Sequence, residues 1–164
     1  MTLQDMTNML SYNRWAMSLQ LQAARALASE EYLAYTESPL GGLHHTFVHI
    51  YAAERLWLSR WLRNEAARLV SPAEVSSLPQ LEKWWVALWR EQDVFMESLS
   101  EHAVQERLTY VDLEGRTCTT ALIHQIQHML NHSNYHRGEI FTMLWRLGIV
   151  PPNLDLIDYY QNVA

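Results

Sequence analysis

The sequence is poor in the residues that mark several common classes of protein. Of its 164 residues only one is a cysteine, Cys118, and only one is a lysine, Lys83. A single cysteine excludes an intramolecular disulfide, so no feature of the sequence requires an oxidising compartment. The formal charge is −6 and no stripe of basic residues is present, which argues against binding to nucleic acid.

Glycine and proline are also scarce, with five of each, which is too few for an all-β chain with many turns. No apolar run is long enough to span a membrane. Residues 1–10 lack the basic segment and apolar core of a signal peptide. We therefore expect a cytoplasmic protein that does not enter the membrane, and the length fits one domain over residues 1–164.

The apolar residues that are present recur at intervals of three, four and seven, which predicts amphipathic helices. The predicted helices cover residues 2–28, 43–63, 78–101 and 120–147. Between the last two helices, a stretch rich in Thr, Tyr and Val surrounds Glu114-Gly115 and predicts a short β-hairpin or an extended excursion. The fold class that follows is all-α, a four-helix bundle, and the amphipathic C-terminal tail is expected to pack back on it.

The last predicted helix carries half of the chain's eight histidines, each four residues after the previous one. A step of four residues turns the helix by about 40° beyond a full turn, so His124, His128, His132 and His136 cannot all face one point. On a helical wheel His136 and then His132 lie nearest the apolar stripe. This pair is therefore placed to look along the bundle interior, while His124 and His128 are expected at solvent, near the site or at a partner chain.

Two histidines at positions i and i+4 can chelate one ion, but a stable site needs a third ligand from another helix. His49 and His45, on the second predicted helix, are the candidates. Ferritin-like di-iron chemistry is excluded because the sequence has no Glu-x-x-His motif. A histidine in a helix is more often a surface or hydrogen-bonded core residue than a ligand. A bundle with buried polar histidines is therefore the alternative.

The segment "NHSNYHRGEIFTMLWRLGIVPPNLD" resembles the C-terminal signature of the DinB / YfiT-like superfamily, bacterial four-helix-bundle metalloproteins distinct from the DNA polymerase of that name. "HIYAAERLWLSRW" is similar to the second-helix signature of that family, and "YNRWA" to the first. The resemblance extends over essentially the whole chain. It implies one divalent ion, zinc or nickel, on His49, His132 and His136, and a homodimer.

The function that the resemblance implies is less defined. Some relatives are transferases or isomerases that depend on a low-molecular-weight thiol such as mycothiol or bacillithiol, which suggests a small electrophilic substrate. Three neutral imidazoles leave a coordination position open to a water or a thiolate. Glu54 and Glu139 are the candidates for a hydrogen bond to an imidazole or for general-base work. The alternatives are a metal-dependent hydrolase and a metal-binding stress-response protein without turnover.

Overall fold

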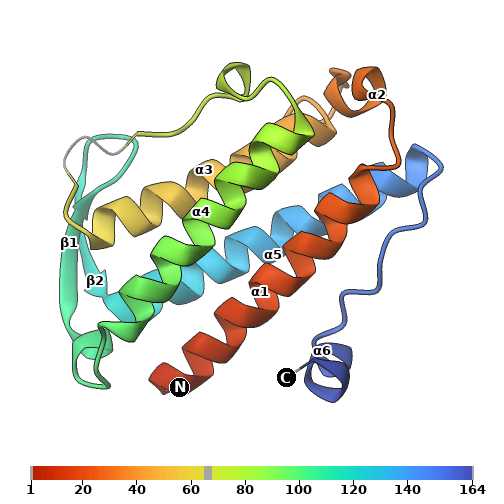
Figure 1. Ribbon diagram of the computed structural model, residues 1–164. Coiled ribbons are helices and arrows are strands. Elements are labelled where there is room, and N and C mark those ends of the chain that lie inside the picture. Colours follow the sequence, from red (N-terminus) through yellow and green to blue (C-terminus); the bar gives the residue numbers. More distant parts are fainter. Residues whose placement is uncertain (1, 65–67, 164) are drawn as a thin grey trace.

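The computed structural model describes residues 2–64 and 68–163, which are predominantly helical, with one small antiparallel sheet (Figure 1). The helices and strands in chain order are α1 (Leu3–Ala24), α2 (Ser29–Leu33), α3 (Leu43–Trp61), α4 (Leu78–Glu97), β1 (Arg107–Val111), β2 (Thr117–Ala121), α5 (Leu122–Arg146) and α6 (Leu156–Asn162). Two single turns of 3-10 helix, Pro72–Glu74 and Ala103–Gln105, precede α4 and β1.

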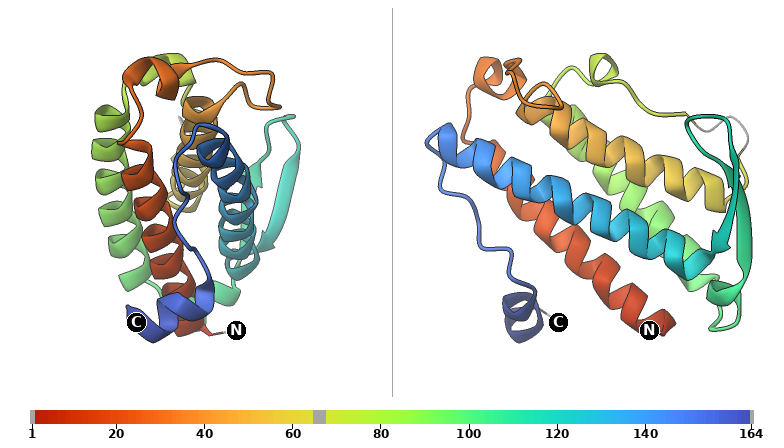
Figure 2. Two further views of the ribbon diagram at one scale, coloured as in Figure 1. Left: turned by 90° about the vertical axis from the view of Figure 1, so that its right-hand side faces the viewer. Right: turned by 180° about the vertical axis from the view of Figure 1, so that it is seen from behind.

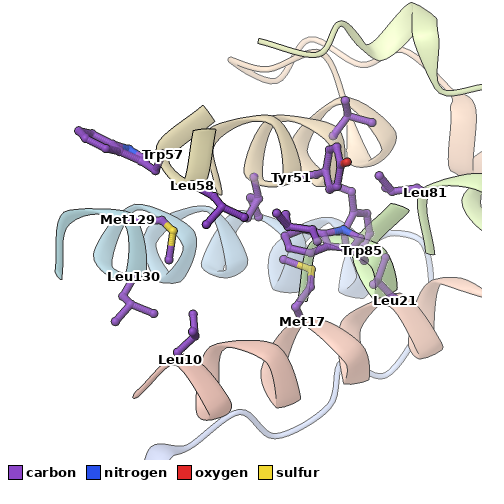
Figure 3. Close-up of a cluster of buried hydrophobic side chains, with 14 of the residues drawn as sticks. Leu10, Met17, Leu21, Tyr51, Trp57, Leu58, Leu81, Trp85, Met129 and Leu130 are labelled. Atoms are coloured by element: carbon purple, nitrogen blue, oxygen red, sulfur yellow. The ribbon is translucent and has the colours of Figure 1, made fainter. Parts of the chain in front are cut away.

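The four long helices, α1, α3, α4 and α5, lie side by side and enclose one apolar core (Figures 1 and 2). Trp85 of α4, Phe47 of α3 and Met17 of α1 are among its fully buried side chains. Figure 3 shows side chains from all four helices meeting in this core. Burial of each large apolar side chain stabilises the fold by about 1.5–3 kcal/mol, so the apolar stripes recognised in the sequence hold the helices together. Within this arrangement α5 packs against α3 on one side and against α1 on another.

The first helix is shorter than predicted, because it ends at Ala24 and not at residue 28. The backbone N–H groups of Arg25, Ala26 and Leu27 donate to carbonyls three residues back, so α1 ends in a tighter, 3-10 type of turn. The chain then forms the short helix α2, which the sequence did not predict. Its Tyr32 is buried against the ring of His44 in α3. Residues 25–28 therefore connect two helices and do not continue α1, and Tyr32 attaches the second of these helices to α3.

The predicted hairpin is confirmed. Strands β1 and β2 pair antiparallel with Tyr110 opposite Cys118, and Gly115 provides the positive φ of 80° that the turn requires. The last strand residue is Ala121, so α5 begins two residues later than the predicted start at 120. The hairpin packs on the end of α3 through Tyr110, whose ring contacts that of Trp57 at a centroid distance of 5.0 Å.

The C-terminal tail packs back on α1 as predicted. Gly148, at φ 77°, ends α5, and the chain returns to place Tyr159 of α6 against Tyr12 and Trp15. The Tyr12 hydroxyl donates a hydrogen bond of 2.6 Å to the Leu154 carbonyl, which ties the returning chain to α1. Among residues 2–64 and 68–163, no helix combines the length and the apolar character needed to cross a membrane.

Candidate metal centre

The histidines of α5 separate by burial as their helical phase predicts. His124 and His128 are exposed, His132 is half-buried and His136 is buried. These four histidines, spaced four residues apart, form a ladder along α5. Because each step turns the helix by about 40° beyond a full turn, the first members of the ladder lie at solvent and the last lie on the α3 side. His132 and His136, which lie on successive turns of α5, therefore both face α3. Their ring centroids are 4.5 Å apart.

His49 of α3 completes a cluster of three imidazoles. One ring nitrogen each of His49, His132 and His136 lies within 4.8 Å of the other two, close enough to hold one metal ion. Of the two candidates that residue spacing left open, His49 is the one that the family resemblance implied; His45 lies outside this cluster, with its ring against Tyr35. Facing helices thus supply the three nitrogens, two from α5 and one from α3.

The distances fit a metal ion. The Nε2 atoms of His49 and His132 are 3.1 Å apart. Two nitrogens bound to one tetrahedral zinc at 2.0–2.1 Å are separated by about 3.3 Å, so this pair is already at ligand spacing. The ring of His136 lies 4.6 Å from that of His49, centroid to centroid, so the third imidazole lies beside the same pair.

The surroundings keep two of these imidazoles neutral. Burial lowers the pKa of His49, and the nearby His136 lowers it further. Burial and the neighbouring histidines lower the pKa of His132 to about 4. Only a neutral imidazole has a lone pair for a metal ion, so burial maintains the ligand form of the site at neutral pH.

Glu139 orients the third imidazole. Its Oε2 accepts a hydrogen bond of 2.8 Å from Nδ1 of His136, one turn earlier on α5. With the proton fixed on Nδ1, Nε2 of His136 is the nitrogen free for an ion. The sequence suggested two roles for Glu139, a hydrogen bond to an imidazole and general-base work. The contact with His136 supports the first.

Glu54 lies elsewhere, although the sequence suggested the same two roles for it. It is fully buried, and its carboxylate accepts hydrogen bonds from Asn13, Ser133 and Gln92 at 2.8, 2.7 and 3.0 Å. None of these donors is an imidazole. Because Asn13 is in α1, Ser133 in α5 and Gln92 in α4, this one carboxylate of α3 joins all four long helices. Ser133 lies next to His132, so the network fixes the part of α5 that carries the histidine pair.

Arg137 extends this network on the α1 side. Its guanidinium is buried and donates to the Asn13 side-chain oxygen, whose amide in turn donates to Glu54. Burial lowers the pKa of Arg137, while Tyr12 and Glu54 act in the opposite direction. The sequence reasoning did not find this network. Its signal was the presence of Asn13, Gln92 and Ser133 on otherwise apolar faces of their helices.

A cavity of about 330 Å³ lies beside the histidine cluster, in the size range of small-molecule sites. It is lined by Tyr135 and Glu139 of α5, by Thr46 of α3 and by the loop at Ser38-Pro39. The ring of Tyr135 contacts that of His136 at 4.9 Å, and Glu139 is the hydrogen-bond partner of the same imidazole. A small molecule in this cavity would therefore lie next to two residues that contact His136.

Comparison with known proteins identifies the family of this chain. The model of the DinB family matches residues 2–162, so the chain belongs to the DinB family. It is 21% identical over 151 residues to Protein DinB of Bacillus subtilis (strain 168), an alignment that covers 88% of this chain and 87% of the relative.

Two solved structures share the fold. The crystal structure of a DinB-like protein from Bacillus subtilis matches with a TM-score of 0.62 and 14% identity, covering 90% of this chain and 97% of the other. A DinB-like protein from Bacillus cereus ATCC 10987 gives a TM-score of 0.59 and 15% identity, covering 92% and 93%. At these identities the two structures support the fold alone.

Proposed function

We propose that this protein binds one divalent ion, zinc or nickel, through His49, His132 and His136, between α3 and α5 of a four-helix bundle. The observation that carries the proposal is the convergence of three imidazoles from two helices, with two Nε2 atoms 3.1 Å apart. A hydrogen bond between neutral imidazoles would explain one pair of rings, but a metal ion accounts for the meeting of all three.

The ligand set favours chemistry at an open position. Three neutral imidazoles leave the double charge of the ion uncompensated and at least one coordination position unfilled. A divalent ion in such a site lowers the pKa of a coordinated thiol and so supplies a thiolate nucleophile at neutral pH. We propose a thiol-dependent transferase or isomerase, with the cavity beside His136 admitting a small electrophilic substrate. In this proposal the Glu139 carboxylate accepts the hydrogen bond of His136 Nδ1 and so orients that imidazole. Glu54 has a structural role, because its hydrogen bonds join α3 to the other three long helices.

Metal analysis of protein purified without a histidine tag tests the site. We expect about one ion per chain in the wild-type protein and loss of most of it in His49→Ala, His132→Ala and His136→Ala. His124→Ala is the matched control, because it removes a member of the same ladder that is exposed on α5. Full metal content in the three variants, or loss in the control, rejects the assignment.

Cobalt substitution tests the thiol chemistry separately. We expect a small thiol such as 2-mercaptoethanol to produce a sulfur-to-metal charge-transfer band in the cobalt protein, and His49→Ala to abolish the band without loss of the helical circular-dichroism signal. A cobalt spectrum that thiols leave unchanged rejects thiol transfer while the metal site stands. In that case a hydrolytic or purely metal-binding role replaces it.

We also propose that the protein is a homodimer in which the outer face of α5 meets its copy. Phe141 and Trp145, one turn apart on this face, are 45% and 66% exposed. Gly138, one turn before Phe141, offers no side chain, and a Cβ there would meet no atom within 4 Å. Two large aromatic side chains beside a glycine allow a second helix to approach closely and bury them.

A further inference from the structure

A second cavity, of about 360 Å³, lies on the other side of α5 from the histidine cluster. It is formed between α1 and α5, with Leu156 near the start of α6 in its wall. Asn134, one of its lining residues, is two positions from both His132 and His136 and so lies roughly 200° around the helix from each. The cavity is therefore separate from the metal centre, and its volume is in the range of small-molecule sites.

The wall of this cavity includes a buried cation, Arg137, that lacks one of its hydrogen bonds. Arg137 is 2% exposed, and its guanidinium donates to Asn13 and, at 3.3 Å, to Asn134. Its Nε is buried without a hydrogen-bond partner. Within the described part of the chain no carboxylate forms an ion pair with Arg137; Glu54 reaches it only through Asn13. The guanidinium carbon lies 5.6 Å from the ring centroid of Tyr12, but an aromatic face supplies no negative charge and leaves Nε without an acceptor. A buried guanidinium without a direct anionic partner is costly, so this one favours an anion from outside the chain.

The rest of the cavity wall is mainly apolar, which indicates that a ligand bound here also has an apolar part. Met6, Met9, Leu130 and Leu156 give the cavity apolar sides, and methionine adapts its shape to different apolar groups. The other polar residues of the wall carry no charge: they are the phenol of Tyr12 and side-chain amides, among them that of Asn131 at the exposed edge. One guanidinium suits the single charge and planar fork of a carboxylate, whereas a phosphate dianion requires more charged donors.

We propose that this cavity, lined by Arg137, is a binding site for a small carboxylic acid with an apolar body. The carboxylate receives the guanidinium hydrogen bonds, and the apolar body lies against the methionines of α1. Such a site is additional to the metal centre and does not require an ion. Because His136 and Arg137 are adjacent in α5, a ligand here also restrains the helix that carries the histidine pair.

The probe is 3-phenylpropanoate, with 3-phenylpropanamide as the uncharged analogue of the same shape. Both are titrated into the ¹⁵N-labelled full chain after treatment with a chelator, so that the acid cannot bind a metal ion. We expect saturable binding of the acid, shifts of the Asn131 and Asn134 side-chain amide signals, and at least tenfold weaker binding of the amide. No saturation at millimolar acid, equal binding of acid and amide, or shifts confined to the His49 region each overturns the proposal.

Variants locate the site without disturbing the core. Asn131→Trp, at the exposed edge of the cavity, should fill it and weaken binding of 3-phenylpropanoate at least tenfold. Gln22→Trp makes a similar amide-to-tryptophan change on an exposed part of α1 away from the cavity, and should leave binding unchanged. Circular dichroism checks that both variants fold. Unchanged binding in Asn131→Trp, or equal loss in both variants, rejects this cavity as the site.

Discussion

Nδ1 of His136 and Oε2 of Glu139 are joined by a hydrogen bond of 2.8 Å within one turn of α5. This bond occupies Nδ1 and leaves Nε2 as the nitrogen available to an ion, and a negative partner makes that nitrogen a better ligand. We expect Glu139→Gln to weaken the binding of zinc about 10–100-fold, measured by competition with a chromophoric chelator, with little change in Tm of the metal-free protein. Glu97→Gln, exposed on α4, is the control. Equal zinc affinity in all three proteins would show that Glu139 does not support the site.

The lowered pKa values of His49 and His132 predict the pH dependence of the metal-free protein. An imidazole in the unfolded chain has a pKa of about 6.5, whereas in the fold that of His132 is about 4. Between these values the unfolded chain binds more protons than the folded one, so stability falls as pH decreases through this window. We expect Tm to fall from pH 7 to pH 4.5, and less steeply in His132→Asn. His124→Asn should retain the wild-type slope.

The same protonation opposes metal binding, because only neutral imidazoles ligate. Since an ion bound to the folded state stabilises it by mass action, a chelator should lower Tm clearly at pH 7.5 and far less at pH 4.5. Differential scanning calorimetry with and without the chelator measures this difference. An equal effect at both pH values would contradict metal binding through histidine.

The buried carboxylate of Glu54 predicts a large loss of stability when it is removed. Glu54→Ala leaves the donors of Asn13, Ser133 and Gln92 buried without their acceptor, and removes the anion linked to Arg137. We expect a decrease of about 3 kcal/mol in the free energy of unfolding, from urea titration. Glu97→Ala, which removes an exposed carboxylate of α4, should change it by less than about 0.5 kcal/mol. A loss below about 1 kcal/mol in Glu54→Ala would mean that the network is not important for stability.

The exposed aromatic face of α5 predicts the oligomeric state. If Phe141 and Trp145 are buried between two copies, Trp145→Glu places two charges in an apolar contact and should shift the mass from dimer to monomer in sedimentation experiments. Val150→Glu introduces the same charge at a residue that is 79% exposed beyond the end of α5, and should leave the mass unchanged. A monomeric wild-type protein at micromolar concentration rejects the proposed dimer.

The sequence alone determined those features that depend on neighbours along the chain. Apolar residues at helical spacing predicted the four long helices, and Thr, Tyr and Val around Glu114-Gly115 predicted the hairpin. The pair His132 and His136 was recognised because a spacing of four residues on a helix brings two side chains to one face, whatever the rest of the fold does. The order of burial along the ladder followed from the same geometry.

The tertiary structure decided which side chains from different helices meet. Residue spacing left His45 and His49 both open, because a helix turns between them by only about 40° beyond a full turn. The family resemblance implied His49, and the packing of α3 against α5 is what brings His49 to the histidine pair. Residue spacing likewise could not assign Glu54 to Asn13, Ser133 and Gln92, which come from three other helices. Local spacing fixes the face on which a side chain lies. The partner on that face depends on how the helices cross and on their offset, and the whole apolar core sets both.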